Sequence, residues 1–482
     1  MNQVPNHPTA FESCSAILNQ IGQYHLLQWW TELSTEEQRE LLADINSVQW
    51  NLLQDILETV VARRSSANPT ASALDNLQPA KVFPQKPTTE LIGLYDEAIE
   101  AGRSLLRSGK VAAFTVAGGQ GTRLGFDGPK GMVPVTPVGS KSLFEIFATT
   151  VLAARRKFGA NIPWYIMTSP ANHEQTVNFL RTNRWFGLPE QDVILFSQGM
   201  LPAFDFQGRA LLAAKHRLAL APDGHGGSLD ALIRSGALAD CQRRGITLLS
   251  YFQVDNPLVK PFDPLFIGLH SITGSEMSTK VCAKADDLER VGNVCLQNGK
   301  VTVIEYSEFP EKLARQRDLS SRRTFDAGNL AIHLLDIAFI DRVISKQHKL
   351  PFRRAEKIVP HIDEQGRLHQ PAKPNAVKLE KFIFDVLPFA TNPLVLEVDR
   401  AEEFSPVKNA TGVDSLETSK RDQNLRACRW LESVGVRIPR HPDGTPNTTV
   451  TISPLFALDP EEIRSHVQQI PAIQPGQHLH LE

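Results

Sequence analysis

The sequence lacks several features that would mark particular classes of protein. Its five cysteines, in 482 residues, are odd in number and lack the short paired spacing of a zinc site or a redox motif. They are predicted to be reduced structural thiols of a cytoplasmic protein. No stretch approaches the roughly 18–20 apolar residues that cross a bilayer, and the N-terminus has no basic segment before an apolar one. Neither secretion nor membrane insertion is expected.

An excess of charge is also missing. Lys and Arg total 51 and Asp and Glu total 53, which gives a formal net charge of −2. No global field therefore attracts nucleic acid or an anionic membrane, and neither is an expected partner. An anionic ligand must be bound by local groups. A monomer or a weak homo-oligomer is expected.

The length favours two or three domains, because a chain of 482 residues exceeds what one compact core usually holds. Residues 9–64 carry Leu, Gln and Glu at helical spacing, with Ser34 placed to begin a helix. Residues 64–88 are rich in Ser, Pro and Ala without periodicity, which predicts a linker. Residues 401–482 have weak periodicity and many prolines, so the sequence predicts little of their structure.

From about residue 91, apolar runs of strand length alternate with helical segments. The strand-like runs are KVAAFTV, IPWYIMTS, DVILFS, RLALAP and ITLLSYFQV, and the helical segments are KSLFEIFATTVLAARRKFG, NHEQTVNFLRTNRWFG and SLDALIRSGALADCQRRG. This alternation is typical of an α/β fold with a mainly parallel sheet, in which ligands bind at the carboxyl ends of the strands. Residues 291–309 add two strand-like runs around Asn298 and Gly299, which predicts a hairpin near the site.

The most informative segment follows the first of these strands. Residues 116–132, VAGGQGTRLGFDGPKGM, contain six glycines, Arg123 and Lys130. Between a strand and a helix, the N–H groups of such a loop converge on phosphate oxygens. No Gly-Lys-Ser/Thr closes a Walker A loop, and three residues between Gly121 and Gly125 exclude a dinucleotide fingerprint. A plain glycine-rich turn is the alternative, but the two cations favour a triphosphate whose transfer requires charge neutralisation.

Eight further blocks follow this loop in order. They are IPWYIMTS, FSQGMLPAF, APDGHGG, VDNPLVK, VIEYSEF, FDAGNLAIH, PNAVKLEKFIFD and EFSPVKNA. The ordered set resembles the eukaryotic-type UDP-sugar pyrophosphorylases, most closely the UDP-N-acetylhexosamine pyrophosphorylases. The resemblance implies a Rossmann-like nucleotidyltransferase domain with a mixed, mainly parallel sheet over residues 91–400. An N-terminal helical region with its linker would occupy residues 1–90, and a small C-terminal domain residues 401–482.

The implied reaction joins UTP and a sugar 1-phosphate into a UDP-sugar and pyrophosphate, with Mg²⁺ or Mn²⁺. By resemblance, Arg123 and Lys130 would hold the β- and γ-phosphates. Lys408 would stabilise charge on the α-phosphate or the incoming sugar phosphate, which requires the C-terminal region to fold back over the site. Gln198 would recognise the uracil edge with the backbone of Gly224. The residues implied to bind UTP are Ala117, Gly118, Gly119, Gln198, Gly224 and Lys378.

A carboxylate is expected at the carboxyl edge of the sheet, because Asp255 follows an apolar strand. Mg²⁺ prefers oxygen ligands that it shares with phosphates and waters, so Asp255 would be its ligand. Capping of the following turn is the alternative interpretation of this residue. Asn256 adds a neutral neighbour.

The resemblance also implies a set of residues around the sugar. They are His225, Gly292, Glu305, Tyr306, Asn329, Phe382 and Phe384. Glu305 would accept hydrogen bonds from sugar hydroxyls, whereas an acid on the surface of the hairpin is the alternative. If their segment is extended, Phe382 and Phe384 lie on one face and form an apolar wall for an acetamido methyl group, although either could be a core residue.

Two residues depart from the N-acetylhexosamine pattern. His225 stands in place of the Asn of Pro-Asp-Gly-Asn-Gly-Gly, and Asp326 stands where Asn is common. Both are expected to border the sugar. We expect N-acetylglucosamine 1-phosphate as the substrate, with glucose 1-phosphate or several sugar phosphates as the alternative. A non-catalytic sensor of nucleotide sugars is an alternative of another class, but it would not need the three cations and Asp255.

Overall fold

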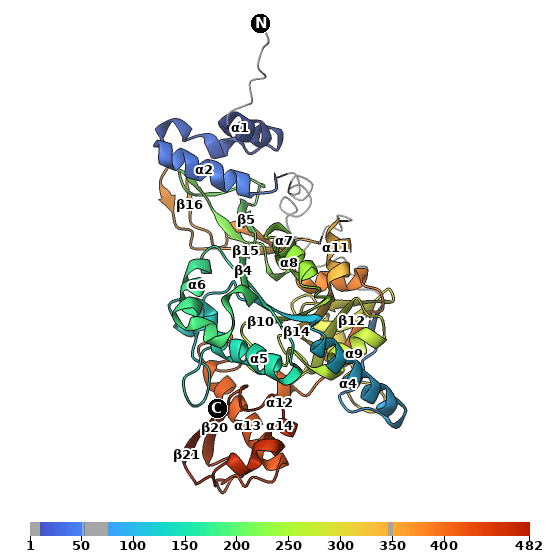
Figure 1. Cartoon of the computed structure of the whole chain (residues 1–482). Helices are drawn as coiled ribbons and strands as arrows, with labels where there is room; N and C mark the ends of the chain where they lie inside the picture. Colours follow the sequence, from blue (N-terminus) through green and yellow to red (C-terminus); the bar gives the residue numbers. More distant parts are fainter. Residues whose placement is uncertain (1–9, 51–52, 54–75, 346–349) are drawn as a thin grey trace. The chain divides into compact units, whose positions relative to one another are not determined.

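The computed structural model describes residues 10–50, 53, 76–345 and 350–482 of the chain (Figure 1). These residues form two compact units. The first contains residues 10–50 and 53, Gln198–Ser228 and residues 350–385, and the second contains residues 76–197, 229–345 and 386–482. The first part of the expected linker, residues 64–75, lies outside the described residues.

The second unit is built around a ten-stranded mixed sheet. Its strands are β1 (Leu77–Pro79), β2 (Val111–Val116), β3 (Trp164–Thr168), β4 (Val193–Ser197), β10 (Leu248–Gln253), β11 (Met277–Ala283), β12 (Asn293–Gln297), β13 (Lys300–Ile304), β14 (Ala327–Asp336) and β19 (Leu394–Glu397). The main path runs β1-β12-β14-β10-β2-β3-β4, with β11 beside β14, β19 beside β11 and β13 beside β12.

The expected parallel arrangement is confirmed for one part of this sheet. Strands β10, β2, β3 and β4 are neighbours in parallel, with Gln253 of β10 opposite Val116 of β2. By contrast, β14 runs antiparallel to β10, β11 and β12. The predicted hairpin is β12–β13, and Asn298 and Gly299 at its turn have φ angles of 51° and 78°. The sheet is therefore mixed, and its parallel part contains the strand that precedes the glycine-rich loop.

Helices accompany this sheet along the chain. They are α4 (Ile92–Arg107), α5 (Leu143–Phe158), α6 (His173–Thr182), α7 (Ser228–Arg234), α8 (Ala237–Arg243), α9 (Pro264–Ile272), α10 (Glu311–Ala314), α11 (Ile337–Ser345), α12 (Arg400–Glu403), α13 (Leu416–Ser433) and α14 (Pro460–His466). The single helix expected over residues 228–245 is divided into α7 and α8, because Gly236 between them has a φ of 79°. None of the described helices combines the length and apolarity needed to cross a membrane.

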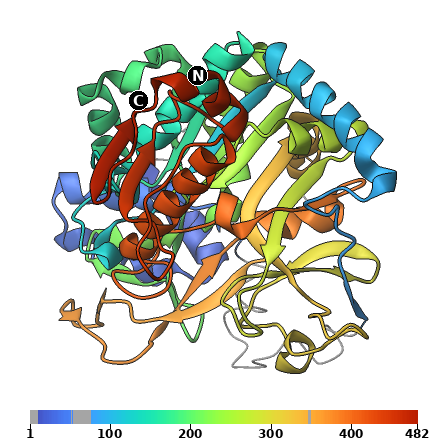
Figure 2. The same ribbon diagram turned by 90° about the horizontal axis from the view of Figure 1, so that it is seen from below.

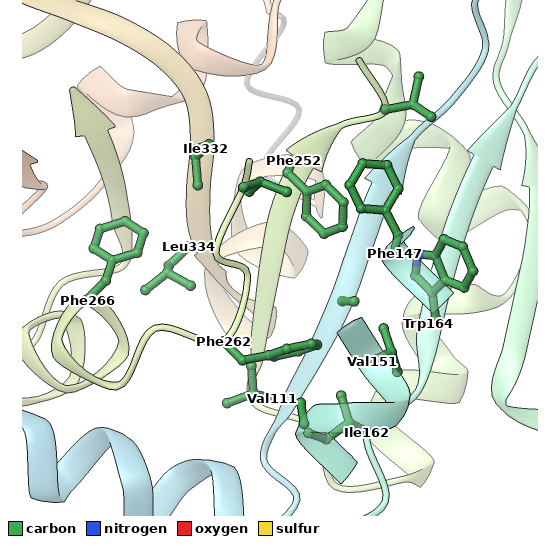
Figure 3. Close-up of a cluster of buried hydrophobic side chains, with 14 of the residues drawn as sticks. Val111, Phe147, Val151, Ile162, Trp164, Phe252, Phe262, Phe266, Ile332 and Leu334 are labelled. Carbon is green, nitrogen blue, oxygen red and sulfur yellow. The ribbon is translucent and has the colours of Figure 1, made fainter. Parts of the chain in front are cut away.

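The main core fixes the strand ends that lead to the site. Figure 3 shows its side chains from strands β2, β3, β10 and β14 and from helix α5. Phe147 of α5 packs edge-on against Phe252 of β10, with ring centroids 5.1 Å apart. Trp164 of β3 is fully buried and donates from Nε1 to Thr115 Oγ1 at 2.7 Å. Burial on this scale holds β2, β3 and β10 firmly beneath the loops at their carboxyl ends.

The first unit combines helices with small sheets (Figure 1). Its elements are α1 (Ala10–Gln20), α2 (Thr35–Ser47), β5 (Met200–Pro202), β6 (Phe204–Asp205), β7 (Leu212–Ala214), β8 (Arg217–Leu218), β9 (Leu220–Pro222), β15 (Arg353–Lys357), β16 (His361–Ile362), β17 (Leu368–His369) and β18 (Ala376–Glu380). The run RLALAP, expected in the main sheet, forms β8 and β9 here, and β9 pairs antiparallel with β5. A short apolar run does not reveal by itself which sheet will bury it.

The N-terminal helices do not form the separate region that the sequence suggests. Leu41 and Ile45 of α2 share a core with Phe204 and Val377, which come from distant parts of the chain. Asp44 accepts two hydrogen bonds from the Arg217 guanidinium, at 2.8 and 2.9 Å. The apolar faces of these helices are thus covered by strands that only the fold brings to them.

Residues 401–482 group with the main sheet, although they have a small core of their own around Trp430, Leu431 and Val450. Within them, β20 (Thr448–Ile452) and β21 (Gln477–Leu481) pair in parallel. Helix α13 donates from Gln423 Nε2 to Val135 O at 2.8 Å. Figure 2 shows the two red strands β20 and β21 side by side. The separate boundary expected near residue 400 is therefore not a boundary between the two units.

Candidate functional site

The residues predicted to bind substrate are divided between the two units, so they are described unit by unit. In the second unit, the glycine-rich loop begins where β2 ends. Ala117 is buried, and its N–H donates to Met167 O at 2.7 Å. Further along, Gly121 N donates to Gly128 O at 2.8 Å and Lys130 N donates to Gly119 O at 3.1 Å. The loop therefore folds back on itself and has a defined shape.

Glycine is required in this loop for more than one reason. A Cβ added to Gly121 would lie 2.9 Å from the Phe126 ring, so packing demands glycine there. Gly125 has a φ of 71°, a backbone conformation that favours glycine. A Cβ on Gly119, by contrast, would meet no atom of the described chain within 4 Å. The space beside Gly119 is thus open, as the predicted approach of a nucleotide requires.

Asn172 holds the glycine-rich loop in place, and the sequence analysis missed it. It is 1% exposed, and its Nδ2 donates to Ala117 O at 3.0 Å and to Gly119 O at 3.2 Å. Its Oδ1 accepts from Ser169 N at 2.8 Å. The side chain therefore ties the loop after β2 to the loop after β3. The sequence shows only an Asn between a predicted strand and a predicted helix, and such an Asn is normally interpreted as the start of the helix.

The structure brings Lys130 and Asp255 together. Asp255 follows β10, the neighbour of β2, and its Oδ2 lies 3.4 Å from Lys130 Nζ. Both side chains are mostly buried, with exposed fractions of 17% for Lys130 and 13% for Asp255. Arg123 lies in the short helix Thr122–Leu124, is exposed and has no ion pair within the described ranges. The loop thus presents one paired and one unpaired cation.

The cap of the turn after β10 is Asn256 rather than Asp255. Leu258 N donates to Asn256 Oδ1 at 3.2 Å, whereas the carboxylate of Asp255 faces Lys130. No group of three or more metal-binding side chains occurs among the residues that the structure describes. A single carboxylate nevertheless fits Mg²⁺, which commonly takes one or two protein carboxylates and fills its remaining positions with phosphate oxygens and water.

The chain does return to this edge before Lys408. Val407 N donates to Asp255 O at 2.8 Å, so the preceding residue is bonded to the loop that carries the candidate metal ligand. Lys408 Nζ lies 3.5 Å from Asp414 Oδ2, and the Lys408 side chain is 38% exposed. The segment before Lys408 therefore does fold back to the loop of Asp255, as the predicted role of Lys408 requires. The catalytic role itself stays a prediction.

Three residues predicted to contact the sugar lie together in the second unit. Asn329 N donates to Gly292 O at 2.8 Å. A Cβ added to Gly292 would lie 3.3 Å from Glu305 Oε1 and 3.7 Å from Asn329 Cβ. Tyr306 follows on the chain and is 46% exposed. Since β14 runs antiparallel to β10, the start of β14 at Asn329 lies toward the edge where β10 leads into Asp255.

Asp326 has protein partners of its own. Its Oδ1 accepts from Lys284 N at 3.1 Å and from Arg323 Nη1 at 3.1 Å. The buried side chain of Lys284 donates from Nζ to Asn293 Oδ1 at 2.9 Å, and burial lowers the pKa of this ammonium. Asp326 therefore orders the chain before Asn329, and its expected contact with the sugar stays a prediction.

In the first unit, the segments of Gln198 and Gly224 are joined by a backbone bond from Asp223 N to Gly199 O of 3.1 Å. Gln198 is 8% exposed. Gly224 has a φ of 83°, and a Cβ there would lie 2.5 Å from Lys381 O. Only glycine therefore fits beside the segment that follows β18, and the two residues expected to recognise uracil are held by one local network.

His225 belongs to an aromatic cluster in the same unit. Its ring is parallel to that of Phe382, with centroids 5.0 Å apart, and it lies 5.7 Å from the Phe384 ring. The Arg353 guanidinium lies over Phe382 and binds Asp385 at 2.7 Å. Burial and, second, the charge of Arg353 lower the pKa of His225 to about 4. The imidazole is therefore neutral at ordinary pH.

The premise of an extended segment at the two phenylalanines is wrong. The chain leaves β18 at Glu380 and enters a short helix, Ile383–Phe389. Both rings still face His225, but Phe384 is only 3% exposed and so serves the core. Phe382 is the more exposed of the pair. The wall proposed for an acetamido group is thus reduced to Phe382 and the stacked imidazole.

Lys378 lies in the middle of β18, between two buried residues. Val377 and Leu379 face the core of the first unit, so alternation along the strand turns Lys378 to the other side. Its ammonium has no ion pair in the described part of the chain and is available for an anion.

The chain matches known proteins over most of its length. The family model of UTP–glucose-1-phosphate uridylyltransferase matches residues 58–482. The UDP-N-acetylhexosamine pyrophosphorylase-like protein 1 of Mus musculus is 35% identical over 94% of each chain. The UDP-N-acetylglucosamine pyrophosphorylase of Saccharomyces cerevisiae is 36% identical over 86% of this chain and 90% of its own.

The fold is also that of a solved structure. The uridine diphosphate N-acetylglucosamine pyrophosphorylase of Trypanosoma brucei, solved in complex with an inhibitor, has a TM-score of 0.83 over 99% of both chains at 24% identity. That similarity confirms the predicted fold class, while the family model and the relatives establish the family. The chain therefore belongs to the UTP–glucose-1-phosphate uridylyltransferase family.

Proposed function

We propose that this protein transfers the uridylyl group of UTP to N-acetylglucosamine 1-phosphate and releases pyrophosphate. The observation that carries the proposal is the Lys130–Asp255 pair, 3.4 Å apart at the sheet edge where the glycine-rich loop begins. A cation and a carboxylate beside open glycine backbone suit a triphosphate with its divalent ion. The names of the Mus musculus and Saccharomyces cerevisiae relatives support the choice of an N-acetylated sugar.

The reaction needs no nucleophilic side chain. A phosphate oxygen of the sugar 1-phosphate attacks the α-phosphorus of UTP, and the bond from that phosphorus to the bridging oxygen of the β-phosphate breaks. Its electron pair leaves with pyrophosphate, whose growing charge Lys130 and Arg123 offset. Lys408 stabilises the charge on the α-phosphate. Positioning of the two substrates for this in-line attack supplies most of the remaining acceleration.

A divalent cation, Mg²⁺ or Mn²⁺, completes the proposal. Asp255 would hold it, and the bound ion would neutralise charge on the triphosphate. The distance of 3.4 Å between Lys130 and Asp255 is longer than a strong charged hydrogen bond, so exchanging this contact for phosphate and metal contacts costs little.

The sugar is the part of the proposal with a live alternative. Glucose 1-phosphate is the second candidate, because His225 stands in the place of the usual Asn and stacks on Phe382 at 5.0 Å. The ring takes up space that a small amide leaves free. A difference of a few contacts is worth about 1–3 kcal/mol in discrimination, so both sugars should react at measurable rates.

A release assay for pyrophosphate tests the proposal. UTP is offered with the 1-phosphates of N-acetylglucosamine, N-acetylgalactosamine, glucose and galactose, and kcat/KM is measured for each. The matched controls are Lys130→Ala, which should be nearly inactive, and Lys312→Ala, an exposed lysine of α10 that should behave as wild type. Faster turnover of glucose 1-phosphate would select the alternative. Binding of UTP without turnover of any sugar phosphate would instead identify a sensor.

We also propose a cytoplasmic location. The support is the state of the five cysteines, which are all buried and all free of disulfides. A reducing compartment suits such a protein. Fractionation of cells that make the tagged chain would test this assignment.

A further inference from the structure

The segment that carries Lys408 is fastened to the loop that carries Asp255. This segment, residues 403–408, begins at the last residue of helix α12 and is buried as far as Val407, whereas Lys408 is partly exposed. The bond from Val407 N to Asp255 O, 2.8 Å long, is its first attachment. The backbone beside Lys408 is thus bonded directly to the backbone of Asp255, although the two residues have separate predicted roles.

Asn256 supplies the second attachment. Its Nδ2 donates to Glu403 O at 2.6 Å, and its Oδ1 accepts from Ser405 N at 3.1 Å. These partners lie 147 and 149 residues further along the chain. The amide is only 4% exposed, so loss of either contact would leave a buried backbone group without its partner. No other side-chain type of this size offers a donor and an acceptor in one plane.

A buried ion pair fixes the start of the segment. Lys280 on β11 is 0% exposed, and its Nζ lies 2.7 Å from Glu403 Oε2 and 2.7 Å from Asp263 Oδ2. Burial by itself disfavours the ammonium, but the two carboxylates outweigh it and raise the pKa of Lys280. The residue that begins the segment is therefore held by the main sheet through its side chain and by Asn256 through its carbonyl.

Helix α13 holds the segment from another side. Ser405 Oγ donates to Asp422 Oδ2 at 2.8 Å, and Ser419 Oγ donates to Ser405 O at 2.9 Å. Ser405 thus has partners on the turn after β10 and on α13. A residue at the end of a segment fixed at so many points has little freedom of its own, which is what a group that must meet a transition state requires.

We propose that Asn256 is a positioning residue, which together with the Lys280–Glu403 ion pair fixes Lys408 relative to Asp255. This inference rests on the proposed function, because it takes Lys408 and Asp255 to act on the same phosphates. Asn256 touches no substrate; it sets the path of residues 403–408 and acts through Lys408. Its loss should therefore lower turnover more than binding.

A double-mutant cycle on kcat tests the inference. Asn256→Ala should lower kcat about 10- to 100-fold and change KM for UTP less than about 3-fold, because Lys408 acts in the transition state. In a Lys408→Ala background, the same substitution should lower kcat by less than about 3-fold, since the residue through which it acts is gone. An equal fall in both backgrounds would overturn the proposal.

Ser405→Ala provides a milder second variant if Asn256→Ala does not fold. It removes one hydroxyl from the segment and leaves Asp422 with its contact to Arg421. It should lower kcat about 3- to 10-fold and again lose its effect when Lys408 is Ala. Ser433→Ala on helix α13 is the matched control, because among the described residues this hydroxyl bonds only to Trp430 O, and kcat should not change.

The outcomes separate this inference from the proposed function. Wild-type turnover by Lys408→Ala would remove the catalytic role of Lys408 and this inference with it. A strongly impaired Lys408→Ala, combined with an Asn256→Ala effect that adds to it in full, would overturn only the positioning role. Melting temperatures of all variants, measured alongside, show whether a fall in kcat follows a loss of folded protein.

Discussion

Substitution of His225 should change how the stability of the protein depends on pH. In the folded state burial and the charge of Arg353 lower the pKa of His225 to about 4, from an ordinary value of 6.5. Below pH 6.5, His225 therefore becomes protonated in the unfolded chain but stays neutral in the folded protein. Above pH 6.5 this residue does not change the free energy of unfolding. As the pH falls from 6.5 toward 4, it lowers that free energy.

The size of the effect follows from the two pKa values. Between pH 7.5 and pH 5, a histidine that titrates at 6.5 when unfolded and at about 4 when folded costs about 2 kcal/mol of stability. Neither His225→Asn nor His225→Phe can contribute this term, because neither side chain titrates. The two variants should differ from each other in absolute stability but share the same, weaker dependence on pH.

Urea unfolding at pH 7.5 and pH 5.0, followed by fluorescence, measures the difference for wild type and both variants. The loss of unfolding free energy on acidification should be about 2 kcal/mol smaller in each variant than in wild type. A loss that is the same in all three proteins would refute the lowered pKa of His225 in the folded protein.

The remaining predictions concern catalysis. Lys130→Ala and Lys408→Ala should each lower kcat/KM by about 100- to 1000-fold, roughly 3–4 kcal/mol, with Lys312→Ala unchanged, and near wild-type turnover would contradict either role. UTP should be strongly preferred, and equal rates with ATP or GTP would remove the assignment of the base site. Removal of divalent ions by EDTA should abolish turnover, and Asp255→Asn should raise the Mg²⁺ concentration needed for half-maximal rate; an unchanged requirement would exclude this ligand. His225→Asn should shift the preference between sugars toward N-acetylglucosamine 1-phosphate, as measured by the ratio of kcat/KM values.

The parts of the fold that the sequence predicts are those encoded by neighbouring residues. Strand β2 and its glycine-rich loop are confirmed because a buried apolar run and a cluster of glycines are local signals. The turn at Asn298 and Gly299 is confirmed for the same reason, since both residues adopt positive φ angles. Asp255 lies at the carboxyl edge as expected, because β10 is a parallel neighbour of β2.

The parts that the sequence does not predict depend on contacts across long stretches of chain. The N-terminal helices pack with strands such as β8 because Asp44 meets Arg217, 173 residues away. Asn172 and Asn256 each form hydrogen bonds to backbone atoms of distant segments, and no spacing of residues along the sequence predicts such bonds. A polar side chain that supports a loop has the same local sequence as one that faces solvent.

The direction of the sugar preference follows from which nitrogen of His225 carries the proton. Ile383 N donates to His225 Nδ1 at 3.1 Å, so the neutral ring carries its proton on Nε2 and offers only a donor. Asn in its place would offer a donor and an acceptor, and the N–H of an acetamido group needs an acceptor. His225→Asn should therefore raise kcat/KM for N-acetylglucosamine 1-phosphate relative to glucose 1-phosphate by about 5- to 100-fold, the scale of about 1–3 kcal/mol for a buried polar group that gains its hydrogen-bond partner. Because the imidazole stays neutral, the wild-type ratio should be constant from pH 6 to pH 8. A ratio that ignores the substitution, or that changes with pH in wild type but not in the variant, would contradict this role for His225.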